Sequence, residues 1–357
     1  MEKLKVDLIY LPSEGTGQTV YSENLAKQLN KLVDLNVINP NHSFVFNLIN
    51  KFHNKLAIKL LPFLLIKRIR KNSLVHITNQ ELFFLLPKIK NKKIITLFDF
   101  GNYTFYKNWT EKDVELLNTA EKIVCISASA KKELTEKFPF FGKKTFVAKC
   151  GLKENSRKSS QNIRKKHGVP ENSKIILFVG SDDSKKNFFT LLNAFFELKD
   201  KNLLLVKIGS KYTFSGKNQR KKFNEFIEEK NLQKKVLFLD FVSEQDLIDF
   251  YFTSEIFVQP SLHEGFGLTL LEAMNCSCPV FCSDIPVFHE VAGNSALFFD
   301  PKKESQLAEK ISLFLNDKKT KKDLIRKGLQ NIKRFSWKKT ATESVKIYKE
   351  ALNEIKT

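Results

Sequence analysis

Short apolar runs alternate along the chain with longer segments in which apolar residues recur every three or four positions. In the first half, the runs fall at residues 5–11, 74–77, 94–98, 123–126 and 145–148. The runs have the length and composition of strands, whereas the segments between them, such as residues 19–32, have the period of an amphipathic helix. Strands that are separated by crossover helices pair in parallel. This order therefore predicts a doubly wound parallel sheet.

The same pattern starts again after a polar stretch. Residues 151–166 are rich in Lys, Ser, Asn and Arg, which is typical of a linker and an entry helix. A capping-box sequence begins at Ser243, and six further strand-like runs follow the linker at residues 175–179, 203–208, 236–239, 256–258, 280–282 and 296–299. We therefore predict an α/β protein with two Rossmann-like parallel-sheet domains, residues 1–155 and 156–335, and a terminal helix, 336–357, that packs back on the first domain. Ligands of such sheets bind at the carboxyl ends of strands, which predicts a cleft between the domains.

Length and composition agree with two ordinary domains. The chain has 357 residues, 42% of them hydrophobic, which is enough for two cores. The five cysteines are an odd number without the spacing of a disulfide framework or a zinc site, so we expect reduced, buried thiols. Residues 1–12 carry Asp7 inside their only apolar run, and no segment has the roughly 20 apolar residues of a membrane helix. We therefore expect a cytoplasmic protein without a signal peptide or a membrane span.

The charge of the chain predicts an anionic partner. Lys and Arg number 60 against 39 Asp and Glu, a formal net charge of +21. The lysines are dispersed and no nucleic-acid-binding signature accompanies them, so a basic nucleic-acid-binding protein is the least favoured alternative and we expect no nucleic-acid partner. Residues 51–71 interleave bulky apolar residues with seven Lys and Arg residues. This segment either lies in the anionic headgroup layer of a membrane or forms helices packed on their own domain with lysines outside.

The most informative segment of the chain follows the strand-like run that ends at Pro260. A turn with two glycines, Gly265 and Gly267, leads into an apolar helix that opens at about Leu268. The free amides of a helix N-terminus can bind a phosphate, and glycines let the backbone come close to a ligand. Glu264 and Glu272 flank the turn and can accept hydrogen bonds from sugar hydroxyls. The segment predicts a sugar-nucleotide site, and the alternative is ordinary capping with solvated glutamates.

From Ile175 to about Trp337 the chain resembles the retaining glycosyltransferases of family four, which have the two-domain GT-B fold. The match consists of several motifs in family order: Phe178-Val179-Gly180, Lys185-Lys186-Asn187, Pro260-Ser261, Glu264-Gly265-Phe266-Gly267, Glu272-Ala273-Met274, Pro279-Val280, Ser283-Asp284, His289 to Gly293, Asp300-Pro301 and Phe335-Ser336-Trp337. The two glutamates have the family's seven intervening residues. Upstream the resemblance is looser and rests on Gly15 and Gly17, on Ser127 with Ser129, and on the strand that ends at Asp99.

The resemblance implies a nucleotide-sugar donor on the C-terminal domain and an acceptor on the N-terminal domain. By resemblance, Glu272 holds the ribose hydroxyls and Glu264 a hydroxyl of the transferred sugar. Lys186 neutralises the charge that builds on the leaving diphosphate, which is electrostatic catalysis. The remaining donor contacts implied by the resemblance are those of Gly180, Ser181, Lys185, Phe266, Gly267, Leu268 and Thr269.

No metal or other cofactor is expected, because no Asp-x-Asp motif occurs and lysine with helix amides takes the place of a cation. The adjacent pair Asp182-Asp183 is predicted to be a pair of turn residues. Retention of the anomeric configuration is compatible with a covalent intermediate or with front-face attack, and the sequence leaves both open.

Departures from the family concern mainly the N-terminal domain. Phe98 stands where the family has a histidine before aspartate, and Phe98 can neither donate nor accept a hydrogen bond. Asp99 is then either an acceptor contact or an N-cap. Gly15 and Gly17 are either an acceptor or phosphate loop or a plain tight turn. Ser181 stands where many relatives have an arginine. Ser277 and Asp240 replace glycines of the family and Cys150 replaces an asparagine, and these three are interpreted as scaffold changes.

Two functions of different class therefore remain beside the nucleic-acid alternative. The first is hexose transfer from a nucleotide sugar to a glycan or glycolipid, with GDP-mannose as the first candidate donor because Gly180-Ser181 with Lys-Lys-Asn resembles mannosyl-transferring relatives. UDP-glucose is the second candidate donor. The other function, suggested by Phe98, is that of a non-catalytic nucleotide-sugar-binding protein.

Overall fold

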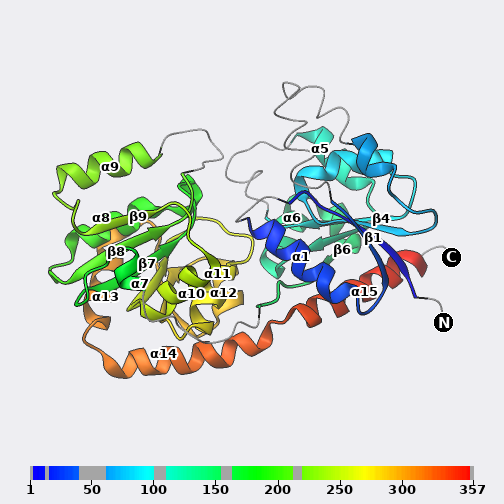
Figure 1. Cartoon of the computed structure of the whole chain (residues 1–357). Helices are drawn as coiled ribbons and strands as arrows, with labels where there is room; N and C mark the ends of the chain where they lie inside the picture. Colours follow the sequence, from blue (N-terminus) through cyan, green and yellow to red (C-terminus); the bar gives the residue numbers. More distant parts are fainter. Residues whose placement is uncertain are drawn as a thin grey trace. The chain divides into compact units, whose positions relative to one another are not determined.

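The computed structural model describes residues 3–12, 16–39, 62–99, 110–153, 163–211 and 219–353. The chain divides into two compact units, an N-terminal unit of Met1–Lys153 with Phe335–Thr357 and a C-terminal unit of Glu154–Arg334. Each unit contains one parallel six-stranded sheet flanked by helices (Figure 1). The α/β class and the two Rossmann-like sheets expected from the sequence are confirmed.

The sheet of the N-terminal unit has the strand order β2-β1-β3-β4-β5-β6. Its strands are β1 (Lys5–Ile9), β2 (Asp34–Ile38), β3 (Leu74–Ile77), β4 (Lys93–Leu97), β5 (Lys122–Cys125) and β6 (Thr145–Val147). Its helices are α1 (Gly17–Leu29), α5 (Glu111–Asn118), α6 (Ala128–Lys137) and α15 (Trp337–Asn353), with 3-10 segments at Gln80–Lys88 and Pro139–Lys144. The edge strand β2 was missed in the sequence because only its last residue, Ile38, is fully buried.

The terminal helix α15 belongs to the N-terminal unit, where it packs against α1 (Figure 1). A buried polar chain joins it to the sheet. His76 of β3 bonds the Tyr348 hydroxyl of α15 at 2.7 Å and the Thr96 hydroxyl of β4 at 2.8 Å. Burial lowers the pKa of His76 to about 3, so the imidazole is neutral near pH 7. His76 is thus a core histidine with both ring nitrogens bonded.

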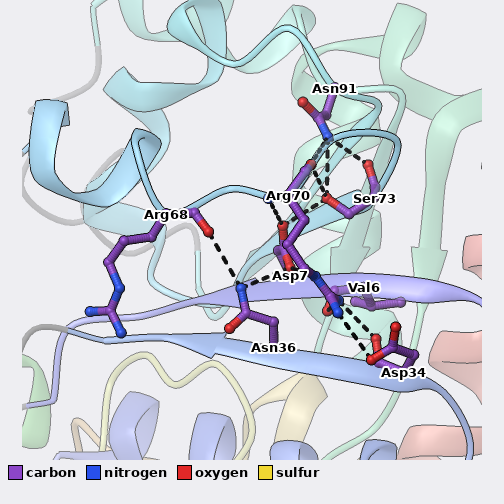
Figure 2. Close-up of polar contacts among 8 residues, drawn as sticks. All are labelled: Val6, Asp7, Asp34, Asn36, Arg68, Arg70, Ser73 and Asn91. Atoms are coloured by element: carbon purple, nitrogen blue, oxygen red, sulfur yellow. Dashed lines mark hydrogen bonds and ion pairs between the residues drawn. The ribbon is translucent and has the colours of Figure 1, made fainter.

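Asp7, in the middle of β1, is fully buried and accepts four hydrogen bonds (Figure 2). The donors are the Arg70 guanidinium at 2.8 Å, the Arg70 backbone N–H at 2.7 Å, the Ser73 hydroxyl at 2.7 Å and the Asn36 amide at 3.0 Å. Arg70 also bonds the Asp34 carboxylate of β2 at 3.0 Å. The cluster therefore fixes the chain that leads into β3 across the two outermost strands of this edge.

The sheet of the C-terminal unit has the order β12-β11-β10-β7-β8-β9. Its strands are β7 (Lys174–Val179), β8 (Leu203–Ile208), β9 (Val236–Leu239), β10 (Ile256–Gln259), β11 (Val280–Ser283) and β12 (Ala296–Phe299). Its helices are α7 (Ile163–Lys166), α8 (Phe188–Glu197), α9 (Gln219–Glu229), α10 (Glu244–Thr253), α11 (Leu268–Asn275), α12 (Pro286–Ala292), α13 (Glu304–Phe314) and α14 (Lys318–Asn331), with 3-10 turns at Ser184–Lys186 and Ile332–Arg334. All six strands were predicted from the sequence within two residues of these bounds.

A core of aromatic and aliphatic side chains fills one face of this sheet, beneath α8, α9 and α13. Phe178, Phe188 and Phe223 pack one against the next. The ring centroids of Phe178 and Phe188 lie 5.0 Å apart, and so do those of Phe188 and Phe223. The five cysteines of the protein are free and buried, as expected. Within the part of the chain that the structure covers, no helix has the length and apolar character needed to cross a bilayer.

Candidate functional site

The candidate site lies at the carboxyl edge of the C-terminal sheet, where the loops after β7, β8 and β10 meet. Parallel strands bring their carboxyl ends to one edge, and backbone bonds join the loops there. The Asp182 N–H donates to the Ser210 carbonyl at 3.0 Å, and the Leu262 N–H donates to the Lys185 carbonyl at 2.8 Å. The Lys-Lys-Asn segment and the two-glutamate segment, 78 residues apart in the chain at Lys186 and Glu264, are therefore in contact.

Lys186 and Glu264 form an ion pair with 2.7 Å between the ammonium and the carboxylate. Their side chains are 22% and 11% exposed, so the pair is largely withdrawn from water. Burial by itself raises the pKa of Glu264, but the Lys186 ammonium, together with Lys185 and the Ser261 hydroxyl, holds the pKa of this carboxyl below its usual value. Two predicted site residues thus meet as charged groups in a sheltered position.

Three donors converge on the same oxygen of Glu264. Besides Lys186, the Ser261 hydroxyl donates to Oε1 at 2.8 Å and the Gln259 amide at 3.0 Å. No hydrogen bond to Oε2 of Glu264 is found from the residues that the structure describes. The carboxylate is therefore held rigidly by one oxygen, and the other can accept a hydrogen bond from a ligand hydroxyl. Gln259 is a member of the site that sequence reasoning missed, because a glutamine at a strand end has no distinctive pattern.

Asn187 ties three motif segments together. It has φ of 54°, in the left-handed region that asparagine tolerates better than most residues. Its side-chain amide donates to the carbonyls of Pro260 at 2.9 Å and Pro301 at 2.8 Å. The asparagine after the two lysines therefore positions the loops after β7, β10 and β12, a bridging role that the sequence alone did not assign.

The predicted helix start at Leu268 is confirmed, and Gly267 precedes it with φ of 97°. A Cβ on Gly267 would lie 2.8 Å from the Phe288 ring, so both the backbone conformation and the space require glycine here. Phe266 is buried, while Leu268 and Thr269 are half-buried in the first turn of α11. Their amides belong to a helix N-terminus, the arrangement that favours an anion.

Glu272 lies one turn inside α11, and the buried Tyr251 hydroxyl of α10 donates to its Oε2 at 3.2 Å. Burial raises the pKa of Glu272; the Tyr251 hydroxyl opposes the rise, and the Glu244 carboxylate adds to it. Tyr251 was not predicted as a site residue, because its role depends on the packing of two helices. Glu272 is therefore a half-buried acceptor oriented by a neighbouring helix.

Asp182 lies in the turn after β7, as predicted, and it also has a role in ion pairing that the sequence did not indicate. Its carboxylate is fully buried and pairs with the fully buried Lys207 ammonium at 2.6 Å and with Arg220 at 2.8 Å. Arg220 also bonds Asp240 at 2.9 Å, and Lys211 pairs with Asp240 at 3.1 Å. Asp182 is thus the centre of an ion network under the loops after β7, β8 and β9, and Asp240 is an ion-pair partner in that network.

Gly180, Ser181 and Lys185 lie in the turn after β7, all half-buried. Asp183 caps the short 3-10 turn that contains Lys185, accepting its N–H at 3.0 Å. A Cβ on Gly180 would lie 3.7 Å from Cδ of Lys186, so the lysine stem runs beside this glycine. The structure brings the predicted residues of the β7 turn together with Glu264.

The predicted residues of the N-terminal unit form a separate group. Gly17 is the first residue of α1, capped by Thr16, with open space where a side chain would be, and Gly15 lies outside the described residues. Phe98 is buried and packs edge-on against Tyr21 at 5.1 Å, which makes it a core residue. The Asp99 N–H donates to the Gln80 side chain at 3.4 Å. The roles of Gly17 and Asp99 toward an acceptor stay predictions.

Comparisons with known proteins agree with this architecture. Residues 159–331 match the family described as glycosyl transferases group 1. O-antigen chain mannosyltransferase B of Escherichia coli is 25% identical over 282 residues, which cover 74% of this chain and 72% of that protein. O-antigen chain mannosyltransferase RfbU of Salmonella typhimurium is 34% identical over 173 residues, 45% of this chain and 46% of that protein.

Among solved structures, Anabaena HepE in complex with UDP-glucose superposes with a TM-score of 0.81 at 16% identity, covering 97% of this chain and 100% of that one. Two Rossmann-like sheets with this C-terminal sequence define a glycosyltransferase of the GT-B fold. Residues 159–331, which make up most of the C-terminal unit, match the group 1 glycosyltransferase family, and the chain is similar to its mannosyltransferase relatives.

Proposed function

We propose that the protein is a retaining, metal-independent glycosyltransferase that moves a hexose from a nucleotide sugar to a glycan or glycolipid. The observation that carries the proposal is the contact of Lys186 with Glu264 at the carboxyl edge of the C-terminal sheet, beside the first turn of α11. A cation and helix amides suit the diphosphate of such a donor, which is part of the leaving group, and a fixed carboxylate oxygen suits its sugar.

Lys186 is the group that favours departure of the nucleoside diphosphate. Charge on the diphosphate grows as the glycosidic bond breaks, and a fixed cation in a sheltered site interacts more strongly with the transition state than with the bound donor. Before the donor binds, the ammonium is neutralised by Glu264 at 2.7 Å. The incoming diphosphate would then share the lysine with Glu264.

GDP-mannose is the favoured donor. Support comes from two relatives that are named as O-antigen mannosyltransferases, at 25% and 34% identity. UDP-glucose is the next candidate, since HepE was solved with UDP-glucose, although its 16% identity supports only the fold. The direct experiment incubates the protein with GDP-mannose or UDP-glucose and measures release of free nucleoside diphosphate with and without a lipid-linked glycan. Binding of a nucleotide sugar without any release would favour the non-catalytic alternative suggested by Phe98.

Metal independence is part of the proposal, because Lys186 and the amides of α11 supply the positive charge that a divalent cation supplies in other transferases. Transfer measured in excess EDTA should match transfer without chelator. Complete loss of transfer in EDTA, with recovery on adding magnesium or manganese, would contradict it.

We also propose that the acceptor is membrane-attached and that the protein contacts the cytoplasmic face of an anionic membrane. The support is the net charge of +21 together with the exposed side chains of the short helix at residues 62–66. Phe63 is 63% exposed and Leu64 is 37% exposed, and the exposed residues Lys67 and Arg68 follow after Leu65 and Ile66. Residues 51–61 of the predicted membrane segment lie outside the described residues.

A further inference from the structure

Lys207 is a lysine in the interior of a parallel sheet, and the proposed function gives it no task. It lies on β8 within the run Leu203–Ile208, in which all six residues are buried, and its own exposure is 0%. An ammonium in such a position is strongly unfavourable unless each of its hydrogen-bond donors finds an acceptor. The hydrogen-bond acceptors of Lys207 therefore indicate its function.

The ammonium has three donors and three acceptors. It bonds the Gly180 carbonyl at 3.0 Å, the Gly209 carbonyl at 2.9 Å and the Asp182 carboxylate at 2.6 Å. The two carbonyls belong to the turns that follow β7 and β8. Lys207 thus holds two turns of the candidate site from inside the sheet.

Only glycine allows the two turns to come this close. Gly209 has φ of 132°, and a Cβ on it would lie 2.3 Å from the Gly180 carbonyl oxygen. The carbonyls of Gly180 and Gly209 both accept from the Lys207 ammonium, which thus satisfies two carbonyls that the close approach of the turns brings together. Without it, the peptide that follows Gly180 would lose the bond that fixes its orientation.

The orientation of that peptide decides where the next N–H points. In a trans peptide the C=O and the following N–H are antiparallel, and the described backbone contains no cis peptide bond. Because the Gly180 carbonyl points inward to Lys207, the Ser181 N–H points away from it. This N–H has no hydrogen-bond partner in the described part of the chain, and Ser181 is half-buried and follows Gly180, which lies beside the stem of Lys186.

We propose that Lys207 is a positioning residue for the donor diphosphate: it holds the Gly180 carbonyl inward and thereby presents the Ser181 N–H to a phosphate oxygen. The inference rests on the proposed function, in which this turn binds the diphosphate. The task of Lys207, which lies beneath the turn, differs from that of Lys186, which contacts the diphosphate itself. Burial lowers the pKa of Lys207 and the Asp182 carboxylate opposes the shift, in keeping with a cation held by its acceptors.

The first test compares ligands with and without phosphates in calorimetric titrations of the parent and of Lys207→Met. GDP and UDP are the charged probes, and guanosine and uridine are the uncharged ones. Loss of one hydrogen bond to a charged group should weaken the better-binding nucleoside diphosphate by about ten- to a hundredfold. The affinity for the matching nucleoside should change by less than about twofold, since its contacts do not involve the turn. Equal loss for both ligands would mean a general structural role and would overturn the proposal.

Two further variants separate positioning from charge and from stability. Lys207→Met combined with Asp182→Asn removes the negative charge that the single variant leaves beneath the turn, and the weakening should persist. Full recovery of diphosphate affinity in the double variant would overturn the proposal, because the loss would then reflect repulsion by Asp182. Lys122→Met is the matched control, since Lys122 is also a buried strand lysine, 2% exposed, but lies on β5 in the other unit. It should bind both ligands as the parent does.

A measurement on the parent keeps the proposal testable if Lys207→Met does not fold. In protein labelled with 15N-serine, the Ser181 amide resonance, assigned with Ser181→Ala, should shift on addition of GDP or UDP and stay in place with guanosine or uridine. An unmoved Ser181 amide at saturating nucleoside diphosphate would overturn the proposal. Failure of the parent to bind either nucleoside diphosphate would instead reject the proposed function on which the inference rests.

Discussion

At the scale of single residues, burial of Glu272 and its proposed binding of ribose hydroxyls favour different protonation states of the carboxyl group. Burial raises the pKa of Glu272, although only its ionised form is the strong acceptor that ribose hydroxyls require. Since the folded pKa lies above the unfolded one, the stability that this group contributes is full below the unfolded pKa and is lost as pH rises through the folded pKa. The ionised form of Glu272, which ligand binding requires, is therefore the form that folding disfavours.

The first prediction concerns this carboxylate. Glu272→Ala should weaken nucleotide binding by about ten- to a hundredfold, because a charge-assisted hydrogen bond is lost. In the parent, affinity should fall as pH drops through the raised pKa of Glu272, and Glu272→Gln should lack this dependence. Calorimetric titration of GDP and UDP between about pH 5 and about pH 8 measures both.

Tyr251→Phe is a near-isosteric companion to these variants. Because the Tyr251 hydroxyl opposes the rise in the pKa of Glu272, its removal should move the fall in affinity to higher pH. The same pH dependence in the parent and in Glu272→Gln would remove Glu272 from the ribose site.

The second prediction separates Lys186 from simple binding. Lys186→Ala should lower turnover by about a hundred- to a thousandfold while weakening donor binding much less, because its interaction grows as the diphosphate leaves. Steady-state kinetics with the cognate donor give kcat and KM, and calorimetry gives Kd. Lys303→Met is a control in the same unit, since Lys303 is 66% exposed and pairs only at 3.7 Å with Asp300. A variant that turns over like the parent would exclude Lys186 from the chemistry.

At the scale of elements, the pattern of apolar residues predicted strands well where the strands are completely buried. The strands of the C-terminal sheet were found because runs such as residues 175–178 are apolar and buried on both faces. The edge strand Asp34–Ile38 was missed because four of its five residues are only half-buried and it carries no apolar run. The local sequence thus predicts a strand when the burial of that strand requires an apolar composition.

The residues of the candidate site likewise fall into those that the sequence pattern predicted and those that it did not. The motif residues Lys186, Glu264 and Glu272 were recognised from spacing, and Lys186 and Glu264 meet in the structure. Gln259 and Tyr251 escaped notice because each acts through one contact made only after folding. The ion pair of Asp182 was missed because an Asp-Asp pair is typical of turns, and its partner Lys207 stands 25 residues further on in another strand.

The third prediction concerns the cluster that secures residues 67–73 to β1. Arg70→Met should lower the free energy of unfolding by about 3 kcal/mol, because Asp7 stays buried without its cationic partner. Urea unfolding followed by circular dichroism measures the loss. Adding Asp7→Asn should recover part of it, whereas Arg68→Met, at an exposed arginine whose guanidinium donates to the Asn39 carbonyl, should change little. A double variant no more stable than Arg70→Met would show that packing, and not charge, is what Arg70 supplies.

At the scale of the whole molecule, a net charge of +21 calls for a partner, and the nucleotide sugar alone does not explain it. Dispersed lysines contribute a long-range field that attracts any anionic surface. Binding to a membrane needs, in addition, apolar side chains that can enter the interface. In the N-terminal unit, Phe63 and Leu64 are exposed apolar residues within four positions of the cations Lys67 and Arg68, which makes the helical residues 62–66 the place to test.

The Asp7 cluster limits which cations can be changed in that test. Arg70 is an internal ion-pair partner, so its replacement would destabilise the unit as well as remove charge. Lys67 and Lys71 are exposed and have no such partner among the ion pairs of the described residues. The informative variant is therefore Phe63→Ser with Lys67→Gln and Lys71→Gln.

The fourth prediction follows from this choice. The parent should sediment with anionic vesicles, be released as salt rises, and remain in solution with neutral vesicles. Each lysine near an anionic surface contributes about 1 kcal/mol, so the triple variant should bind anionic vesicles at least about tenfold more weakly while its affinity for GDP and UDP stays unchanged. Phe140→Ser with Lys137→Gln and Lys143→Gln removes the same charge and a phenylalanine of similar exposure, 59% against 63%, from another part of the same unit. If both triple variants lose vesicle binding equally, the attraction comes from net charge alone and residues 62–71 are not the docking surface.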